Sequence, residues 1–146
     1  MAEISPHTRY LPGLLLCHAL FILRVLCQLL QLVHPVSLLP PFESWHSGAL
    51  PYGWLLCSQL AIITAFSLVV RGFFRRSTLP RRRVGRWLIT FGSLYFGVMM
   101  VRLIAGLTIA GTHPWFGATI PAFFHLVLAS FLLLCGHFHW IYGDET

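Results

Sequence analysis

The sequence predicts an all-α integral membrane protein in which four helices cross the bilayer, arranged as a single domain over residues 1–146. Three observations lead to this fold class: the composition, the spacing of the apolar segments and the placement of the arginines. Hydrophobic residues make up 57% of the chain and charged residues 10%, whereas soluble domains average about 45–50% and about 25%. A soluble fold of this composition would expose apolar surface to water, and a bilayer removes that cost.

Four apolar segments are long enough to span the hydrocarbon core, which takes about 20 helical residues. The first follows Arg9 and continues past Arg24 for a full bilayer width with no small-residue cleavage site after it. We therefore interpret it as a retained helix and not as a signal peptide. Tryptophans lie near the segment ends, as in the aromatic belts of membrane proteins. The predicted spans are 11–33, 52–70, 87–110 and 121–142.

The placement of charge predicts the orientation of these spans. All ten basic residues are arginine, and seven of them lie between Arg71 and Arg86. The two other connecting loops contain no basic residue and one acid, Glu43. Because arginine-rich loops stay on the cytoplasmic side, we expect this loop and both termini to be cytoplasmic, in a plasma (inner) membrane. The cluster is a short loop between apolar segments and not a folded basic surface, which argues against nucleic-acid binding.

Polar residues inside the predicted spans form the candidate ligand-binding site. Arg24 and Gln28 lie four residues apart on the first span, and Tyr95 and Arg102 lie seven apart on the third, so each pair shares a helix face. Gln59 lies on the second span. From a rise of about 1.5 Å per residue, we expect Arg24, Gln59 and Arg102 to form one polar layer roughly 12–15 Å below the outer helix ends.

This polar layer has almost no counter-charge in the sequence. The four acids are Glu3, Glu43, Asp144 and Glu145, and only Glu43 is predicted on the outer side. Arginine binds carboxylate and phosphate oxygens in a two-pronged way, which favours a pocket for the polar head of a lipid, a quinone or another amphiphile. The structural alternative is that both arginines extend towards water, or cap neighbouring helices and so stabilise the bundle.

The two halves of the sequence resemble each other. In each half an arginine precedes a His-Pro pair, with Arg24 before His34 and Arg102 before His113. Each half also contains a tryptophan followed six residues later by a proline at the start of a span. This pattern is consistent with two tandem helical hairpins related by duplication. The alternative is that any membrane hairpin tends to carry Trp at the interface and Pro at a helix start.

The histidines offer an alternative, cofactor-binding site. His125 and His139 are fourteen residues apart on nearly one face, a spacing that resembles helices of b-type cytochromes, but His18 and His34 on the first span point in different directions. One b-type haem between His18 and His139 is compatible with their predicted depth. The four cysteines lie inside apolar segments without close pairing, and we predict no metal site.

No complete catalytic motif is present in the sequence. We therefore expect a non-catalytic membrane subunit that binds an amphiphile and works with membrane lipid and with protein partners, either in a larger assembly or as a homo-oligomer. Gly92, Gly97, Ala105 and Gly106 on the third span would allow close packing against another helix. The alternatives are a redox protein that uses b-type haem or quinone, and a small transporter built from the two hairpins.

Overall fold

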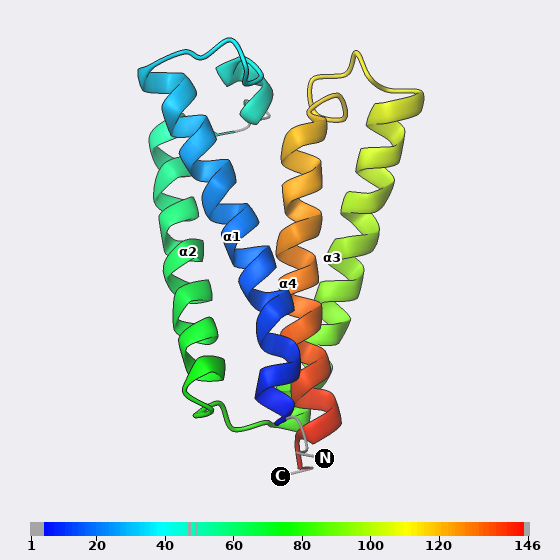
Figure 1. Cartoon of the computed structure of the whole chain (residues 1–146). Coiled ribbons are helices and arrows are strands. Elements are labelled where there is room, and N and C mark those ends of the chain that lie inside the picture. The colour runs from blue at the N-terminus through cyan, green and yellow to red at the C-terminus, as the bar shows by residue number, and fades with distance from the viewer. Residues whose placement is uncertain (1–4, 47, 49, 145–146) are drawn as a thin grey trace.

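The computed structural model describes residues 5–46, 48 and 50–144 and contains four long helices in these residues (Figure 1). Each of the four is long and apolar enough to cross a membrane, which confirms the predicted all-α membrane fold. The elements are α1 (Pro6–Val33), the short 3-10 helix η1 (Phe42–Trp45), α2 (Tyr52–Phe74), α3 (Arg82–Thr108) and α4 (Thr119–Tyr142).

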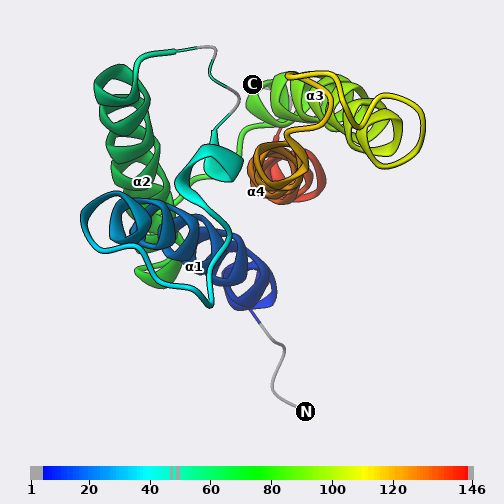
Figure 2. The same cartoon turned by 90° about the horizontal axis from the view of Figure 1, so that it is seen from above.

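The helices alternate in direction and form two hairpins, α1–α2 and α3–α4 (Figure 1). We call the end that holds the 75–81 connection the inner end, and the end that holds the 34–51 and 109–118 loops the outer end. α1 begins and α4 finishes at the inner end. Viewed from the outer end, α4 lies between α1 and α3, and η1 lies over the bundle (Figure 2). α4 packs against both α3 and α1, and α1 also packs against α2.

The helices extend beyond the predicted spans at the inner end. α1 begins at Pro6 instead of residue 11, α2 continues to Phe74, and α3 already begins at Arg82. Hydropathy marks only the part of a helix that lies in lipid, whereas arginine is a good helix former and continues the helix past that boundary. At the outer end α4 begins at Thr119, which places Pro121 in the first turn, where its missing N–H costs nothing.

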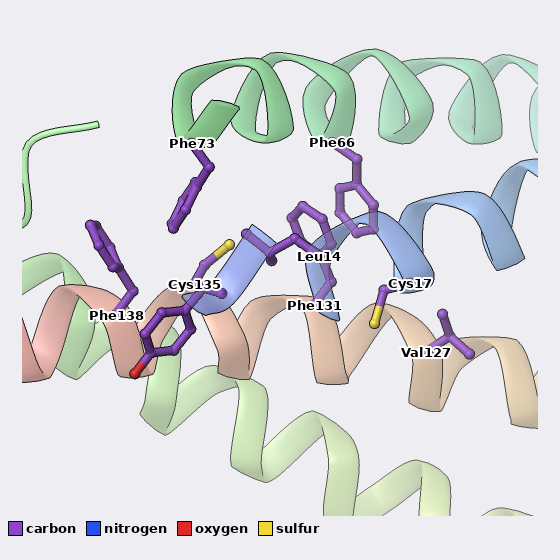
Figure 3. Close-up of a cluster of buried hydrophobic side chains, with 9 residues drawn as sticks. Leu14, Cys17, Phe66, Phe73, Val127, Phe131, Cys135 and Phe138 are labelled. Atoms are coloured by element: carbon purple, nitrogen blue, oxygen red, sulfur yellow. The ribbon is translucent and has the colours of Figure 1, made fainter. Parts of the chain in front are cut away.

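Aromatic rings form the core of the inner half (Figure 3). Phe66 of α2 stacks on Phe131 of α4 with ring centroids 3.6 Å apart, and Phe73 contacts Phe138 edge to face at 4.6 Å. The backbones of α2 and α4 make no close approach in the described residues, so these large side chains carry the contact between them. The buried cluster comprises Tyr10, Leu14, Cys17, Phe66, Phe73, Val127, Phe131, Cys135 and Phe138.

Hydrogen bonds between distant segments close the inner end. The ring Nε2 of His7 bonds the carbonyl of Thr78 at 2.9 Å, and the Tyr10 hydroxyl bonds Nδ1 of His137 at 2.5 Å. The backbone N–H of Arg81 donates to Nδ1 of His139 at 3.0 Å. These contacts tie α1 to the connection and to α4 at the inner end. The buried polar and charged side chains of the described residues lie instead in the outer half.

Small residues set the close crossing of α3 and α4. A β-carbon at Gly85 would meet the backbone of His139 and Trp140, and one at Gly92 would meet the Leu133 side chain. Gly92 therefore packs against another helix, as the sequence predicts. Gly97 faces open space instead, and Gly106 packs against the carbonyl of Phe116 in the following loop.

Candidate functional site

In the first hairpin, Arg24 connects α1 to the outer loop. Its Nη2 donates to the backbone carbonyl of Trp45 at 2.9 Å, and its guanidinium lies 5.6 Å from the centre of the Phe124 ring of α4. Trp45 is itself fixed by an indole N–H bond to the carbonyl of Pro40 at 3.0 Å. Arg24 therefore holds η1 in place over the bundle, which is one of the structural roles that the sequence allows.

The second hairpin repeats this contact. Nε and Nη2 of Arg102 donate to the carbonyl of Trp115 at 3.1 and 2.8 Å, and the guanidinium stacks over the indole ring at 4.3 Å. The third nitrogen, Nη1, reaches only the sulfur of Met99 at 3.9 Å. In both hairpins the intramembrane arginine thus binds the carbonyl of the tryptophan that belongs to the repeated sequence pattern.

The two predicted glutamines meet between α1 and α2. Nε2 of Gln59 donates to Oε1 of Gln28 at 3.0 Å. The remaining polar atoms of this cluster are buried without a hydrogen-bond partner in the described chain. They are Arg24 Nε, Gln28 Nε2, Tyr52 Oη and Gln59 Oε1. A buried polar atom without a partner costs about 1–3 kcal/mol, so this cluster has unused binding capacity at membrane depth.

Tyr95 and His125 form the other half of the layer. The Tyr95 hydroxyl hydrogen-bonds Nδ1 of His125 across the α3–α4 interface. Both side chains interact electrostatically with Arg24 and with Arg102. The pair belongs to the second hairpin and lies within electrostatic range of both arginines.

The structure thus brings all five sequence-predicted site residues into one region, in two groups. Gln28 and Gln59 meet between α1 and α2, with Arg24 one turn away on α1, while Tyr95 and Arg102 line α3. Arg24 lies about 14 Å below the end of α1 but Arg102 only about 9 Å below the end of α3. The layer is therefore shallower on the second hairpin than the sequence predicts, because α3 ends at Thr108 and not at residue 110.

The layer carries two positive charges with no acid beside them in the described part of the chain. Arg24 and Arg102 expose 6% and 3% of their surface, and no ion pair joins either one to Glu43 or Asp144. The tryptophan carbonyls are neutral, so they satisfy hydrogen bonds without balancing the charge. A guanidinium at the bilayer centre costs about 2.5–3.5 kcal/mol on insertion scales, and an anionic or strongly dipolar partner would offset that cost.

A groove gives access to Arg102 from the lipid-facing side of α3. Its volume is about 520 Å³, within the range of small-molecule sites. Its walls are almost entirely apolar, and Gly97 opens its floor because nothing lies within 4 Å of a β-carbon there. The residues that line this groove are Ser93, Leu94, Gly97, Val98, Val101, Arg102, Trp115 and Phe116.

Sequence reasoning missed three contributors to this site. The sequence analysis considers His125 only for its spacing from His139, although its position near the start of α4 is a usable signal for the polar layer. The carbonyls of Trp45 and Trp115 are backbone groups, which no residue pattern marks. Gln31, on the same face of α1 as Arg24, does not join the layer. It binds the loop instead, through the carbonyls of residues 39 and 40 and the N–H of residue 36.

The two candidate haem ligands lie against different elements. Nε2 of His18 bonds the hydroxyl of Ser67 on α2 at 3.1 Å, whereas Nδ1 of His139 accepts the N–H of Arg81 at 3.0 Å. No contact joins the two rings in the described residues. Haem ligation by His18 and His139 stays a prediction, in which each ring would have to leave its present hydrogen-bond partner to bind iron.

The fold and site define a small four-span helical membrane protein with a polar layer in its outer half. Comparisons with protein-family models, curated proteins and solved structures gave no match. What the chain does must therefore be inferred from its own residues.

Proposed function

We propose that the protein is a non-catalytic membrane subunit that binds the anionic or carbonyl head of an amphiphile in the outer half of the bundle, through Arg24 and Arg102. Gln28, Gln59 and Tyr95 support this site. The observation that carries the proposal is the pair of buried guanidiniums without a carboxylate in the described chain. Buried polar atoms that lack partners lie on the α1 and α2 side of the layer.

Arg102 is the residue best placed to contact the head directly. Its Nη1 has only a weak sulfur contact, and the guanidinium borders a groove that opens towards lipid. A carboxylate, phosphate or quinone oxygen at Nη1 would receive a charge-assisted hydrogen bond. The apolar walls of the groove fit a hydrocarbon tail that continues towards Gly97. Arg24, which is enclosed by Trp45 and Phe124, contributes positive charge to the layer and keeps the outer loop in place.

The subunit role follows from how little of the chain lies outside the helices. Only the 34–51, 75–81 and 109–118 segments connect the four helices, and none of them is long enough to form a separate domain. The connections themselves therefore offer little surface for chemistry outside the bilayer, which favours work together with partner proteins. We therefore assign the protein to a larger membrane assembly or to a homo-oligomer.

Native mass spectrometry of the purified chain tests this proposal. Wild type should retain one discrete lipid- or quinone-sized ligand. Arg102→Gln should lower its occupancy at least about tenfold, because a hydrogen bond to a charged group contributes about 1.5–3 kcal/mol, and Arg24→Gln should lower it as well.

Gln31→Ala is the matched control for this experiment. It removes a buried polar side chain that fixes the same outer loop but lies outside the layer, so its ligand occupancy should equal that of wild type. If wild type and both arginine variants carry the same ligands, the arginines act only as loop anchors and the proposal is wrong.

A further inference from the structure

A second hollow lies on α3 at the inner end, in the region of the arginine-rich connection. Its volume is about 270 Å³, and its lining residues are Arg83, Arg86, Trp87 and Thr90. These positions recur every three or four residues, so they share one face of α3. Gly85 and Gly92 lie on the opposite face and pack against α4, so the hollow, which we call the inner hollow, faces away from the bundle.

The polar groups of the inner hollow are unused within the described chain. Arg83 and Arg86 are exposed, and neither has a hydrogen bond or an ion pair with a described residue. The neighbouring Arg82 differs, because it turns to the other side and stacks over Trp140 of α4 at 4.7 Å. Arg83 and Arg86 are therefore available to bind a ligand.

The hydroxyl of Thr90 is also available. Four other serine and threonine hydroxyls within the helices, those of Ser58, Thr64, Ser67 and Thr108, donate to a carbonyl three or four residues earlier. Such back-bonding is the usual way to satisfy a hydroxyl inside a helix. Thr90 makes no such bond to a described residue, although it lies one turn from Arg86 and could donate to the same ligand.

The depth of the inner hollow matches a lipid headgroup. Arg83 and Arg86 begin the helix, and Trp87 marks the level at which aromatic side chains meet headgroups. Half of a hydrocarbon core of about 30 Å corresponds to about ten helical residues. An acyl chain that starts at Trp87 would therefore run along the same face of α3, past Ser93 and Leu94, and end near Gly97.

The charge of the inner hollow selects the class of lipid. Its lining contains two guanidiniums and no carboxylate. A phosphate can bind both arginines, but the cationic group of a zwitterionic head would find no acid in the lining.

We propose that the inner hollow is a binding site for the phosphate group of an anionic phospholipid, held by Arg83, Arg86 and Thr90 with Trp87 at its side. The headgroup site is distinct from the amphiphile headgroup site at Arg102, because the residues that line the inner hollow do not line the outer groove. Only the acyl chain would reach Ser93, Leu94 and Gly97, which also line the outer groove.

The test adds palmitoyl-oleoyl phosphatidylglycerol, or phosphatidylcholine with the same chains, to the delipidated full-length protein and measures retained lipid by native mass spectrometry. Wild type should prefer phosphatidylglycerol. The Arg83→Gln/Arg86→Gln variant should lose at least about tenfold in apparent affinity for it, because it removes the charge-assisted hydrogen bonds to the phosphate. Arg102→Gln should leave this binding unchanged, so failure of the outer site cannot be confused with failure of the inner one.

The matched control is Arg75→Gln/Arg76→Gln. It removes two exposed arginines from the same end of the bundle with the same change in net charge, but neither residue lines the inner hollow. It should retain wild-type affinity. Thr90→Val, which keeps all charges, should weaken phosphatidylglycerol binding about fivefold. Equal losses in both double variants would show a diffuse charge effect, and equal retention of the two lipids would show no headgroup site. Either result overturns the proposal.

Discussion

Alanine substitutions at two glycines of α3 test the close contact between α3 and α4. An ideal β-carbon at Gly85 would lie 2.5 Å from the backbone nitrogen of Trp140 and 2.8 Å from the carbonyl carbon of His139. Both are backbone atoms of α4, so the steric clash can be removed only if one of the two helices moves. At Gly97 nothing lies within 4 Å of the added atom.

The expected magnitude follows from comparing the two variants. Both substitutions gain the same helix propensity, about 1 kcal/mol, so the difference between them isolates the cost of overpacking, about 1–3 kcal/mol. We expect Gly85→Ala to be less stable than Gly97→Ala by that amount in equilibrium unfolding in mixed micelles, followed by circular dichroism. Equal unfolding midpoints for the two variants would refute the close α3–α4 contact, and with it the alignment of Tyr95 against His125.

Three further predictions concern topology, the buried amides and the histidines. Reporters that fluoresce only in the cytoplasm should give signal when fused in the 75–81 connection and at the C-terminus, and signal from the loop between α1 and α2 would reverse the orientation. Gln28→Leu should destabilise the bundle by about 1–3 kcal/mol, because the side-chain N–H of Gln59 loses its hydrogen-bond acceptor. The Gln28→Leu/Gln59→Leu variant should recover most of that loss. Equilibrium unfolding of both variants measures the two changes in the free energy of unfolding. The absorption spectrum of the purified protein should lack a Soret band, and a band that disappears in His18→Ala and His139→Ala would instead establish haem.

The sequence was sufficient to predict the membrane fold because hydropathy over about 20 residues is a strong signal. It also predicted that five polar residues belong to one region, since helical spacing fixes the face of each residue and the rise per residue fixes its depth. The helix ends were predicted less well. Hydropathy reports the boundary with lipid, and α2 continues through Arg71 to Phe74 because arginine favours helix.

The partners of the arginines could not be predicted from the residues. Arg24 and Arg102 bind the carbonyls of Trp45 and Trp115, and a backbone acceptor looks the same at every position in a sequence. The loops that carry these carbonyls differ in length, so no fixed spacing relates each arginine to its tryptophan. The repeated residue types were visible in the sequence, but the contact they share required the three-dimensional structure.

The groove beside Arg102 was also hidden from sequence analysis. The sequence indicates only that Gly97 would allow close packing against another helix, because small residues usually mark helix contacts in membranes, and contact with a partner's helix stays a prediction. Its position relative to Gly92 determines the outcome: Gly92 faces Leu133 of α4, while Gly97, five residues later, is rotated by about 140° and faces outward. The same residue type therefore closes one interface and opens a groove on the other side of the helix.

Site-specific photo-crosslinking at Val101 tests the central claim, that Arg102 holds the head of one amphiphile, most directly. Val101 lines the groove, whereas Leu107 is exposed on the same helix outside it. A benzophenone side chain at position 101 should capture one dominant species, identified by mass, which Arg102→Gln abolishes. The same group at position 107 should capture the mixture of bulk lipids in both backgrounds. Identical mixtures at positions 101 and 107, unchanged by Arg102→Gln, would contradict the account.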